Sequence, residues 1–371
     1  MRFNGQQAPD GNHQTRKMFF YISGRLPLLL IVLSTLLFGA SCITVKTKDK
    51  TPTLLKTESA AKEQLLREVE RFSRVDSLHA KMDLKFEDNS FAQFGSKEIY
   101  RSADGEVVLQ RPSNIYLKVQ VPMIKTDVAQ MTSDGDNFRV AILQDGGSGK
   151  YKKFVKGRNH ADYSRLQNAI DDNNDDGAVS QNVNAFANLR PQHFTDAMLV
   201  RPLSQDNIYT HSTTFQIEED LTQPKKSPLR VVNRGYYLLD EFAKSDSGEL
   251  KILRRFWFDR VGGIRLARQQ IFDEKGEIES DITYGIPGTL TDTGNFSNLP
   301  LRITVTRPQE KYAMTLTYQS PSSVTIGGTY PARAFMLENS WGLEEVDLDR
   351  ELQEIVNGST SSPVNIGGRT Q

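Results

Sequence analysis

The stretch VVLQRPSNIYLKVQVPMIKTDVAQMTSDGDNFRVAI (residues 107–142) carries the strongest signal for the fold. Within it, residues 114–122 alternate between apolar and polar side chains, which is typical of an antiparallel strand with one buried face. Residues 127–143 hold Asp134-Gly135, a favoured turn pair, between two apolar runs, and this pattern predicts a hairpin. The stretch therefore predicts neighbouring antiparallel strands joined by short turns.

The segments that precede this stretch extend the pattern. Residues 60–77 place their large apolar side chains at helical spacing, and residues 78–87 then alternate strictly, so a helix followed by a strand is expected. Residues 96–112 are expected to form a hairpin around Asp104-Gly105.

The segments that follow it contain one more helix and further strands. Residues 184–200 are expected to form a helix that begins near Pro191, and strand-like segments continue from there to residue 320. Turn signals recur at short intervals, which favours a meander of antiparallel strands over βαβ units. The predicted fold class is therefore α+β, mainly antiparallel β.

Composition and short motifs exclude several classes of function. The 46 basic residues balance the 46 acidic ones, so the chain lacks the basic excess of a nucleic-acid-binding protein. One cysteine, Cys42, excludes an intramolecular disulfide framework and a thiolate-rich metal site. The acidic run at 171–177 lacks the glutamate that an EF-hand needs, and Tyr151 stands where a phosphate loop needs serine or threonine. The five histidines are scattered, so no catalytic residue, metal site or cofactor is predicted.

The N-terminal region indicates export. Basic residues precede an apolar run of 13 residues at 26–38, which fits the core of a secretory signal peptide and is too short to span a bilayer as a helix. A buried core helix is the alternative. Gly39-Ala40-Ser41 before Cys42 resembles the bacterial lipobox, although Gly39 stands where leucine is usual. That resemblance implies lipidation of Cys42, and an incidental small apolar residue is the alternative.

The expected organisation follows from these signals. It comprises a signal peptide with a lipobox (1–41), a polar tether (42–59), one domain (60–345) with an insertion at about 144–185, and a disordered tail (346–371). The insertion contains a basic group from Lys150 to Arg158, which could contact anionic head groups or simply be solvated.

The order of the motifs resembles the LolA/LolB superfamily of lipoprotein carriers and receptors and the related lipoprotein-sorting domains. The shared features are an N-terminal helix, a strand, the Arg111-Pro112 pair after the next strands, and the Ser133-Asp134-Gly135 turn. The resemblance covers most of residues 60–340 and implies a half-open curved β-barrel whose concave side is covered by helices. The insertion at 144–185 departs from the family's pattern.

The resemblance also implies a binding site for acyl chains. Residues that would line the apolar cavity are Leu84, Phe86, Leu109, Leu117, Val119, Phe138, Phe256, Phe258, Ile303 and Leu316. Residues that would contact a lid helix are Arg111, Phe194, Met198 and Leu199. In carriers of this family the arginine of the Arg-Pro pair hydrogen-bonds the lid. An ordinary arginine at a strand end, and a plain core for the apolar residues, are the alternatives.

Two functions are consistent with the sequence. The first is a membrane-anchored, non-enzymatic lipoprotein that binds acyl chains of lipoproteins or lipids, and the second is an interaction lipoprotein with a filled core. Ile43 after the cysteine favours the outer membrane, facing the periplasm, by analogy with Gram-negative sorting. The expected partners are therefore the membrane, through the N-terminal lipid anchor, and acyl chains, but not nucleic acid.

Overall fold

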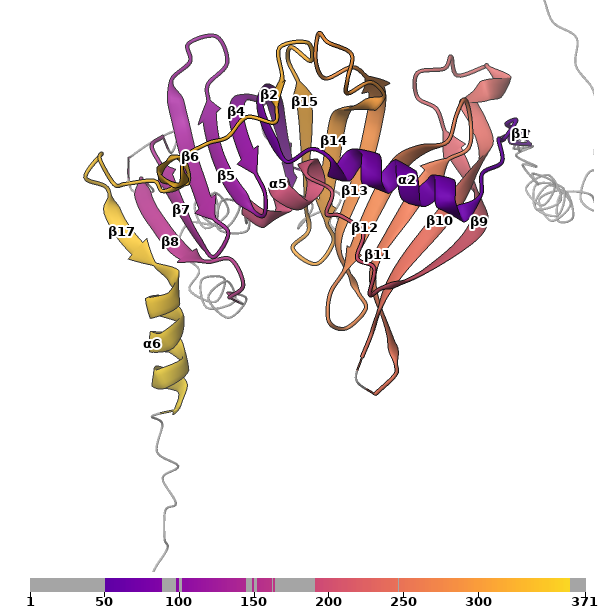
Figure 1. Cartoon of the computed structure of the whole chain (residues 1–371). Coiled ribbons are helices and arrows are strands. Elements are labelled where there is room, and N and C mark those ends of the chain that lie inside the picture. Colours follow the sequence, from indigo (N-terminus) through magenta and orange to yellow (C-terminus); the bar gives the residue numbers. More distant parts are fainter. Residues whose placement is uncertain are drawn as a thin grey trace, which may run out of the picture. The chain divides into compact units, whose positions relative to one another are not determined.

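Alternating apolar and polar residues build the main feature of the structure, a long β-sheet (Figure 1). In the computed structural model the described residues are 51–88, 98–99, 102–144, 149, 152–161, 163, 191–245 and 247–360. The chain divides into two units, Met1–Thr51 and Pro52–Gln371, and the description that follows concerns the second. The predicted signal peptide and Cys42 lie outside the described residues.

The sheet has two runs of consecutive strands. The first run is β2 (Ser77–Asp88), β3 (Glu98–Ile99), β4 (Ala103–Gln110), β5 (Asn114–Gln120), β6 (Asp127–Asp134), β7 (Asn137–Ile142) and β8 (Lys153–Arg158). The second is β9 (Ile208–Glu219), β10 (Val231–Lys244), β11 (Leu250–Asp259), β12 (Arg265–Phe272), β13 (Ile278–Gly288), β14 (Leu299–Arg307) and β15 (Tyr312–Tyr318). Short pieces complete the described structure: β1 (Thr53–Leu54), β16 (Thr325–Ile326), β17 (Glu344–Asp347) and the 3₁₀ turns η2 (Pro228–Arg230) and η3 (Ala332–Phe335).

Hydrogen bonding joins the two runs through β15 and β2. The order across the sheet is β9-β10-β11-β12-β13-β14-β15-β2-β4-β5-β6-β7-β8-β17, with β1 beside β10 and with β3 and β16 beside β2. Among the described strands only β1–β10 and β8–β17 pair in parallel, so the predicted mainly antiparallel fold is confirmed. The end strands β9 and β17 do not pair with each other, so the described sheet is not closed.

The helices form where apolar residues recur at helical spacing. The helix α2 (Lys62–Ser73) buries Leu65, Val69 and Phe72 against the sheet, as its sequence predicts. The helix α5 (Pro191–Met198) begins at proline, whose fixed φ suits the first turn of a helix, and it contacts β5, β6 and β14. The third described helix is α6 (Leu348–Thr360).

The predicted hairpin around Asp104-Gly105 is wrong. Both residues lie inside β4 and pair with Asp83 and Met82 of β2. A Cβ atom on Gly105 would lie 2.7 Å from the side chain of Leu84, so glycine here serves close packing between strands. The dipeptide signal for a turn is local, whereas this requirement comes from a residue 21 positions away in the sequence.

The predicted insertion at 144–185 is wrong for residues 153–158, which form β8 between β7 and β17. Phe154 and Val155 of this strand are buried. The lysines beside them mask the apolar alternation in the sequence. Except for residues 149, 152–161 and 163, the remainder of this range after residue 144 lies outside the described residues.

The predicted tail at 346–371 is wrong for residues 346–360, because β17 pairs with β8 and α6 packs on the core through Leu348, Leu352 and Ile355. Ion pairs join Lys153 to Glu344 and Arg158 to Asp349, the latter at 3.1 Å. Within the basic group, Lys153, Lys156 and Arg158 therefore have acidic partners in the chain. Residues 361–371 lie outside the described residues.

The predicted tether at 42–59 also contains structure near its end. Thr53 and Leu54 form β1 beside β10, and the backbone N–H of Glu58 donates to the carbonyl oxygen of Arg260 at 2.8 Å. Residues at the end of the predicted tether are therefore part of the sheet's surroundings, and the sequence does not show this because their partners lie far along the chain.

Candidate binding site

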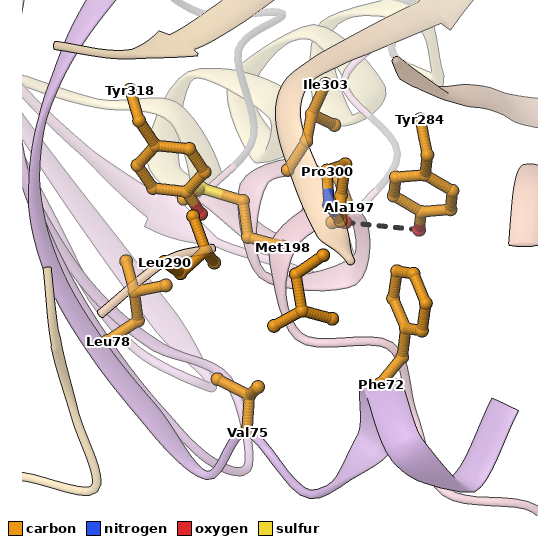
Figure 2. A pocket seen from close by; sticks show the side chains of 11 residues that line it. Phe72, Val75, Leu78, Ala197, Met198, Tyr284, Leu290, Pro300, Ile303 and Tyr318 are labelled. Atoms are coloured by element: carbon orange, nitrogen blue, oxygen red, sulfur yellow. Dashed lines mark hydrogen bonds between the residues drawn. The ribbon is translucent and has the colours of Figure 1, made fainter. Parts of the chain in front are cut away.

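A small apolar cavity lies where the end of α2, the helix α5 and the covered face of the sheet meet (Figure 2). Its volume is about 20 Å³, which is room for roughly one water molecule. Its lining residues are Phe72, Val75, Leu78, Ala197, Met198, Tyr284, Leu290, Leu299, Pro300, Ile303 and Tyr318. A pocket for a small-molecule ligand typically has about 300 Å³ or more, so an acyl chain fits only if a neighbouring element moves.

The ten residues predicted to line a lipid cavity lie in the hydrophobic core. Nine of them are buried and Phe86 is half-buried. Only Ile303 among them lines the cavity of Figure 2. The others pack against neighbouring side chains, and their contact with a ligand stays a prediction.

Three of the four predicted lid-contact residues, Phe194, Met198 and Leu199, lie on or directly after α5, over the middle of the sheet. Phe194 and Leu199 are each 1% exposed, and Met198 is 8% exposed. Met198 and its neighbour Ala197 form one wall of the cavity. This helix is therefore the element whose displacement would enlarge the cavity most directly.

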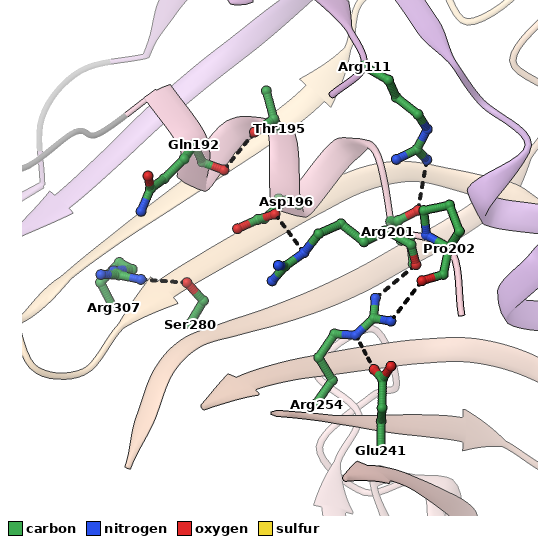
Figure 3. A network of polar contacts seen from close by, with 12 residues as sticks. Arg111, Gln192, Thr195, Asp196, Arg201, Pro202, Glu241, Arg254, Ser280 and Arg307 are labelled. Atoms are coloured by element: carbon green, nitrogen blue, oxygen red, sulfur yellow. Dashed lines mark hydrogen bonds and ion pairs between the residues drawn. The ribbon is translucent and has the colours of Figure 1, made fainter. Parts of the chain in front are cut away.

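Arg111 holds the backbone that follows α5. We call residues 191–202, the helix with the four residues after it, the α5 segment. One guanidinium nitrogen of Arg111, Nη2, donates to the carbonyl oxygen of Val200 at 2.8 Å (Figure 3). The same nitrogen donates to the carbonyl oxygen of Ser73, at the end of α2, at 3.0 Å. Arg111 thus joins β4, α2 and the α5 segment at one point.

A second arginine holds the same segment from the other side. Arg254 of β11 donates from Nη1 to the carbonyl oxygen of Arg201 at 2.8 Å and from Nη2 to that of Pro202 at 3.2 Å (Figure 3). Its Nε contacts the carboxylate of Glu241, and both side chains are almost fully buried. The carboxylate also accepts from Asn207 at 2.7 Å and Tyr209 at 2.9 Å.

The charge of Glu241 depends on this arginine. Burial acts to raise the pKa of Glu241, but the hydrogen bond and positive charge of Arg254 outweigh it, so the pKa lies below the ordinary value of 4.5. The buried charges of Glu241 and Arg254 are tolerated because the two groups neutralise each other and because their remaining donors and acceptors are hydrogen-bonded. The ion pair with Glu241 therefore orients the guanidinium group of Arg254, whose Nη1 and Nη2 donate to the backbone of the α5 segment.

Three further polar contacts involve the helix itself. His193 Nδ1 lies 2.8 Å from the hydroxyl of Tyr312, and the hydroxyl of Tyr284 donates to the carbonyl oxygen of Ala197 at 3.2 Å. Asp196 forms an ion pair with Arg201 at 3.2 Å, within the segment. Most of the remaining packing of the segment on the sheet is apolar, which is non-directional and permits displacement more readily than a dense polar network would.

Several of these residues were not predicted from the sequence. Glu241 and Arg254 are charged residues at inward positions of alternating strands, and that irregularity is the one available signal. Tyr284 and Tyr318, which place hydroxyl groups among the apolar cavity walls, follow the ordinary strand alternation and carry no local signal. Only the register of β10 with β11 brings Glu241 and Arg254 together.

The loop between β5 and β6 exposes two apolar side chains. Met123 is 94% exposed and Ile124 is 71% exposed, while Lys125 in the same loop contacts Asp104. Isolated exposed apolar residues are ordinary, but two adjacent ones at the tip of a hairpin form a compact apolar contact point.

The described residues contain neither a cluster suited to a metal ion nor a helix suited to cross a membrane. No group of three or more histidine, cysteine, aspartate or glutamate side chains is placed there to hold a metal ion. None of the helices in those ranges is both long and apolar enough to cross a membrane.

No protein-family model matches this sequence, and no curated protein sequence matches it either. Among solved structures, the chain is similar to a LolA superfamily protein from Nitrosomonas europaea, with 11% identity and a TM-score of 0.38 over 75% of this chain and 99% of that one. It is also similar to a domain named for outer-membrane lipoprotein sorting from Vibrio parahaemolyticus, with 11% identity and a TM-score of 0.35 over 73% of this chain and 95% of that one.

A third similar structure is a DUF1329 family protein from Desulfovibrio piger, with 11% identity and a TM-score of 0.36 over 75% of this chain and 96% of that one. All three likenesses have 11% identity and TM-scores no higher than 0.38. No role of a particular side chain is carried over from them.

Proposed function

We propose that this chain is a lipid-anchored, non-catalytic protein of the bacterial envelope that binds acyl chains of lipoproteins or lipids between its sheet and the α5 segment. In this proposal the sheet is a half-open curved barrel, and α2 and α5 cover its concave side. The protein takes part in lipoprotein sorting or lipid handling at the outer membrane.

The arrangement of the α5 segment carries the proposal. The segment fills the middle of the covered face with Phe194, Met198 and Leu199, and it meets a small cavity with apolar and tyrosine walls. Arginine side chains from β11 and from the end of β4 hold its backbone at three carbonyl oxygens. An element that is apolar underneath and fastened by a few polar bonds can leave and return, and its departure would uncover surface suited to an acyl chain.

The proposal is tested by ligand binding and by identification of co-purified lipid. We expect the detergent-extracted protein to carry lipid or lipoprotein in native mass spectrometry, and we expect the delipidated protein to bind a fluorescent fatty acid in a saturable way. A protein that carries no lipid and shows no saturable fatty-acid binding would contradict the proposed function.

The second candidate is an interaction lipoprotein with a filled core and no ligand. The observation that favours it is the cavity volume of about 20 Å³, which is far below that of a ligand pocket. The same titration separates the two candidates, since a permanently filled core binds no fatty acid.

Membrane attachment of this protein is expected to depend on Cys42. Lipidation there would supply the acyl chains that stable anchoring needs, at about 0.8 kcal/mol for each buried methylene. We expect Cys42→Ser to move the protein from the membrane pellet to the soluble fraction after signal cleavage, with its circular dichroism unchanged.

The exposed pair Met123 and Ile124 offers a second, weaker membrane contact. If it acts in this way, Cys42→Ser protein retains weak binding to phospholipid vesicles, and Met123→Asp in the same background removes it. A Cys42→Ser protein that stays fully in the membrane pellet would show that the anchor lies elsewhere.

A further inference from the structure

The hydroxyl group of Tyr318 faces the cavity. Tyr318, at the end of β15, is 6% exposed, and Figure 2 shows its hydroxyl end directed among the side chains that line the cavity. Within the described part of the chain this hydroxyl makes no hydrogen bond. Phenylalanine would fill the same space without a hydroxyl, so tyrosine at this position adds one hydrogen-bonding group to the cavity.

The surroundings of Tyr318 are otherwise apolar. Leu78, Leu290 and Met198 are among the residues that line the same cavity. Burial raises the pKa of Tyr318, so the side chain stays a neutral hydroxyl at any physiological pH. A neutral tyrosine hydroxyl can donate a hydrogen bond to an acceptor such as a carbonyl oxygen without itself gaining or losing a charge.

Tyr284 supplies a second hydroxyl at the same cavity. In the described structure it donates to the carbonyl oxygen of Ala197, a residue of the α5 segment (Figure 2). When the segment moves away, this hydroxyl loses its acceptor and becomes available to the space that the segment leaves. The two tyrosines would then present two donors in a pocket that is apolar elsewhere.

We propose that Tyr318 binds the carbonyl group at the head of an acyl chain once the α5 segment is displaced. This inference rests on the proposed function and adds the residue that recognises the head of the ligand: Tyr318 binds the carbonyl of the acyl chain, a contact that a plain hydrocarbon cannot make. The carbonyl accepts a hydrogen bond from the hydroxyl of Tyr318, and the methylene chain lies against the apolar face of the sheet. A free fatty acid and an acyl ester of a lipid or lipoprotein share this chemistry.

The test compares ligands with and without the carbonyl. The probe is diphenylhexatriene, a fluorescent hydrocarbon without a hydrogen-bonding group, and palmitic acid and methyl palmitate serve as competitors. In Tyr318→Phe we expect unchanged affinity for the probe and roughly three- to tenfold weaker competition by the carbonyl ligands. A loss for palmitic acid alone identifies a free acid as the ligand, and a loss for methyl palmitate as well identifies the carbonyl of an ester as sufficient.

Two controls keep the outcome interpretable. Thermal unfolding of Tyr318→Phe should match that of the wild type, because no hydrogen bond of this hydroxyl to another described residue is lost. Tyr116→Phe removes a half-buried hydroxyl on β5, away from the cavity lining, and should leave every affinity unchanged.

The outcomes separate this inference from the proposed function. Equal competition in wild type and Tyr318→Phe overturns the role of the tyrosine and leaves acyl-chain binding intact. If the wild type binds neither the hydrocarbon probe nor the carbonyl ligands, the proposed function fails, and this inference fails with it.

Discussion

Arg254→Ala is expected to lower the free energy of unfolding by about 3–5 kcal/mol, since it leaves the buried carboxylate of Glu241 without its cation. The carbonyl oxygens of Arg201 and Pro202 also lose their donors, so the α5 segment should be held less firmly. Urea denaturation monitored by tryptophan fluorescence measures the first effect, and amide hydrogen exchange of residues 197–201 measures the second.

A matched control lies next to Arg254 on the same strand. Arg255 pairs with Asp240 on the opposite face of the sheet, where its side chain is 32% exposed. Because solvent screens this pair, Arg255→Ala should lower the free energy of unfolding by less than about 1 kcal/mol. If the two variants are equally stable, the buried pair does not stabilise the fold in the way we describe.

The pH dependence of Arg254→Ala gives a second readout. In the wild type the pKa of Glu241 lies below 4.5, so its stabilising contribution is present above that pH and is lost as the pH falls through the folded-state value. Without Arg254, burial raises the pKa of Glu241, and the folded state then binds a proton more readily than the unfolded state. The stability deficit of Arg254→Ala should therefore shrink as the pH is lowered from 7 towards 4.

The parts of the fold that follow from local patterns could be predicted from the sequence. The alternation at 114–122 is present as β5, and the helix near Pro191 begins at that residue. Period-two alternation and helix start signals depend on neighbouring residues alone, so no knowledge of the tertiary structure is needed.

The parts that depend on distant partners could not be predicted. Gly105 resembles a turn residue until Leu84 is placed beside it, and β8 becomes a strand only through pairing with β7 and β17. The pairing of Glu241 with Arg254 could not be predicted for the same reason, because the sequence of either strand does not show which residue will lie opposite it. Register is a property of the assembled sheet.

Of the residues predicted for the site, Met198 and Ile303 line the cavity, and the role of all of them in ligand binding stays a prediction. Arg111 was singled out from a motif, and it does contact the backbone after α5. The cavity, however, is lined mainly by residues from the end of α2, from β13 to β15 and from the loop that contains Leu290. Alternation shows which face of a strand is covered, and it does not show where the covering elements leave space.

Arg111→Leu is expected to raise the affinity for a fluorescent fatty acid by roughly 10- to 100-fold. The variant loses the hydrogen bonds to Ser73 and Val200, and bonds from a charged donor contribute about 1.5–3 kcal/mol. If ligand binds only after the α5 segment leaves, its apparent affinity is reduced by the small population of that state. Weakening the closed arrangement raises this population, and about 1.4 kcal/mol corresponds to a tenfold change.

The comparison that tests this mechanism uses two further variants. Arg111→Lys keeps the charge but not the planar group that reaches both carbonyl oxygens, so it should give an intermediate affinity. Arg158→Leu removes an arginine that contacts Asp349 of α6, and it should leave the affinity unchanged because α6 does not line the cavity. Faster amide hydrogen exchange at residues 197–201 should accompany the gain in affinity for Arg111→Leu. If Arg111→Leu folds normally and binds no more tightly than Arg158→Leu, Arg111 is an ordinary arginine at a strand end, and the α5 segment is not held closed by it.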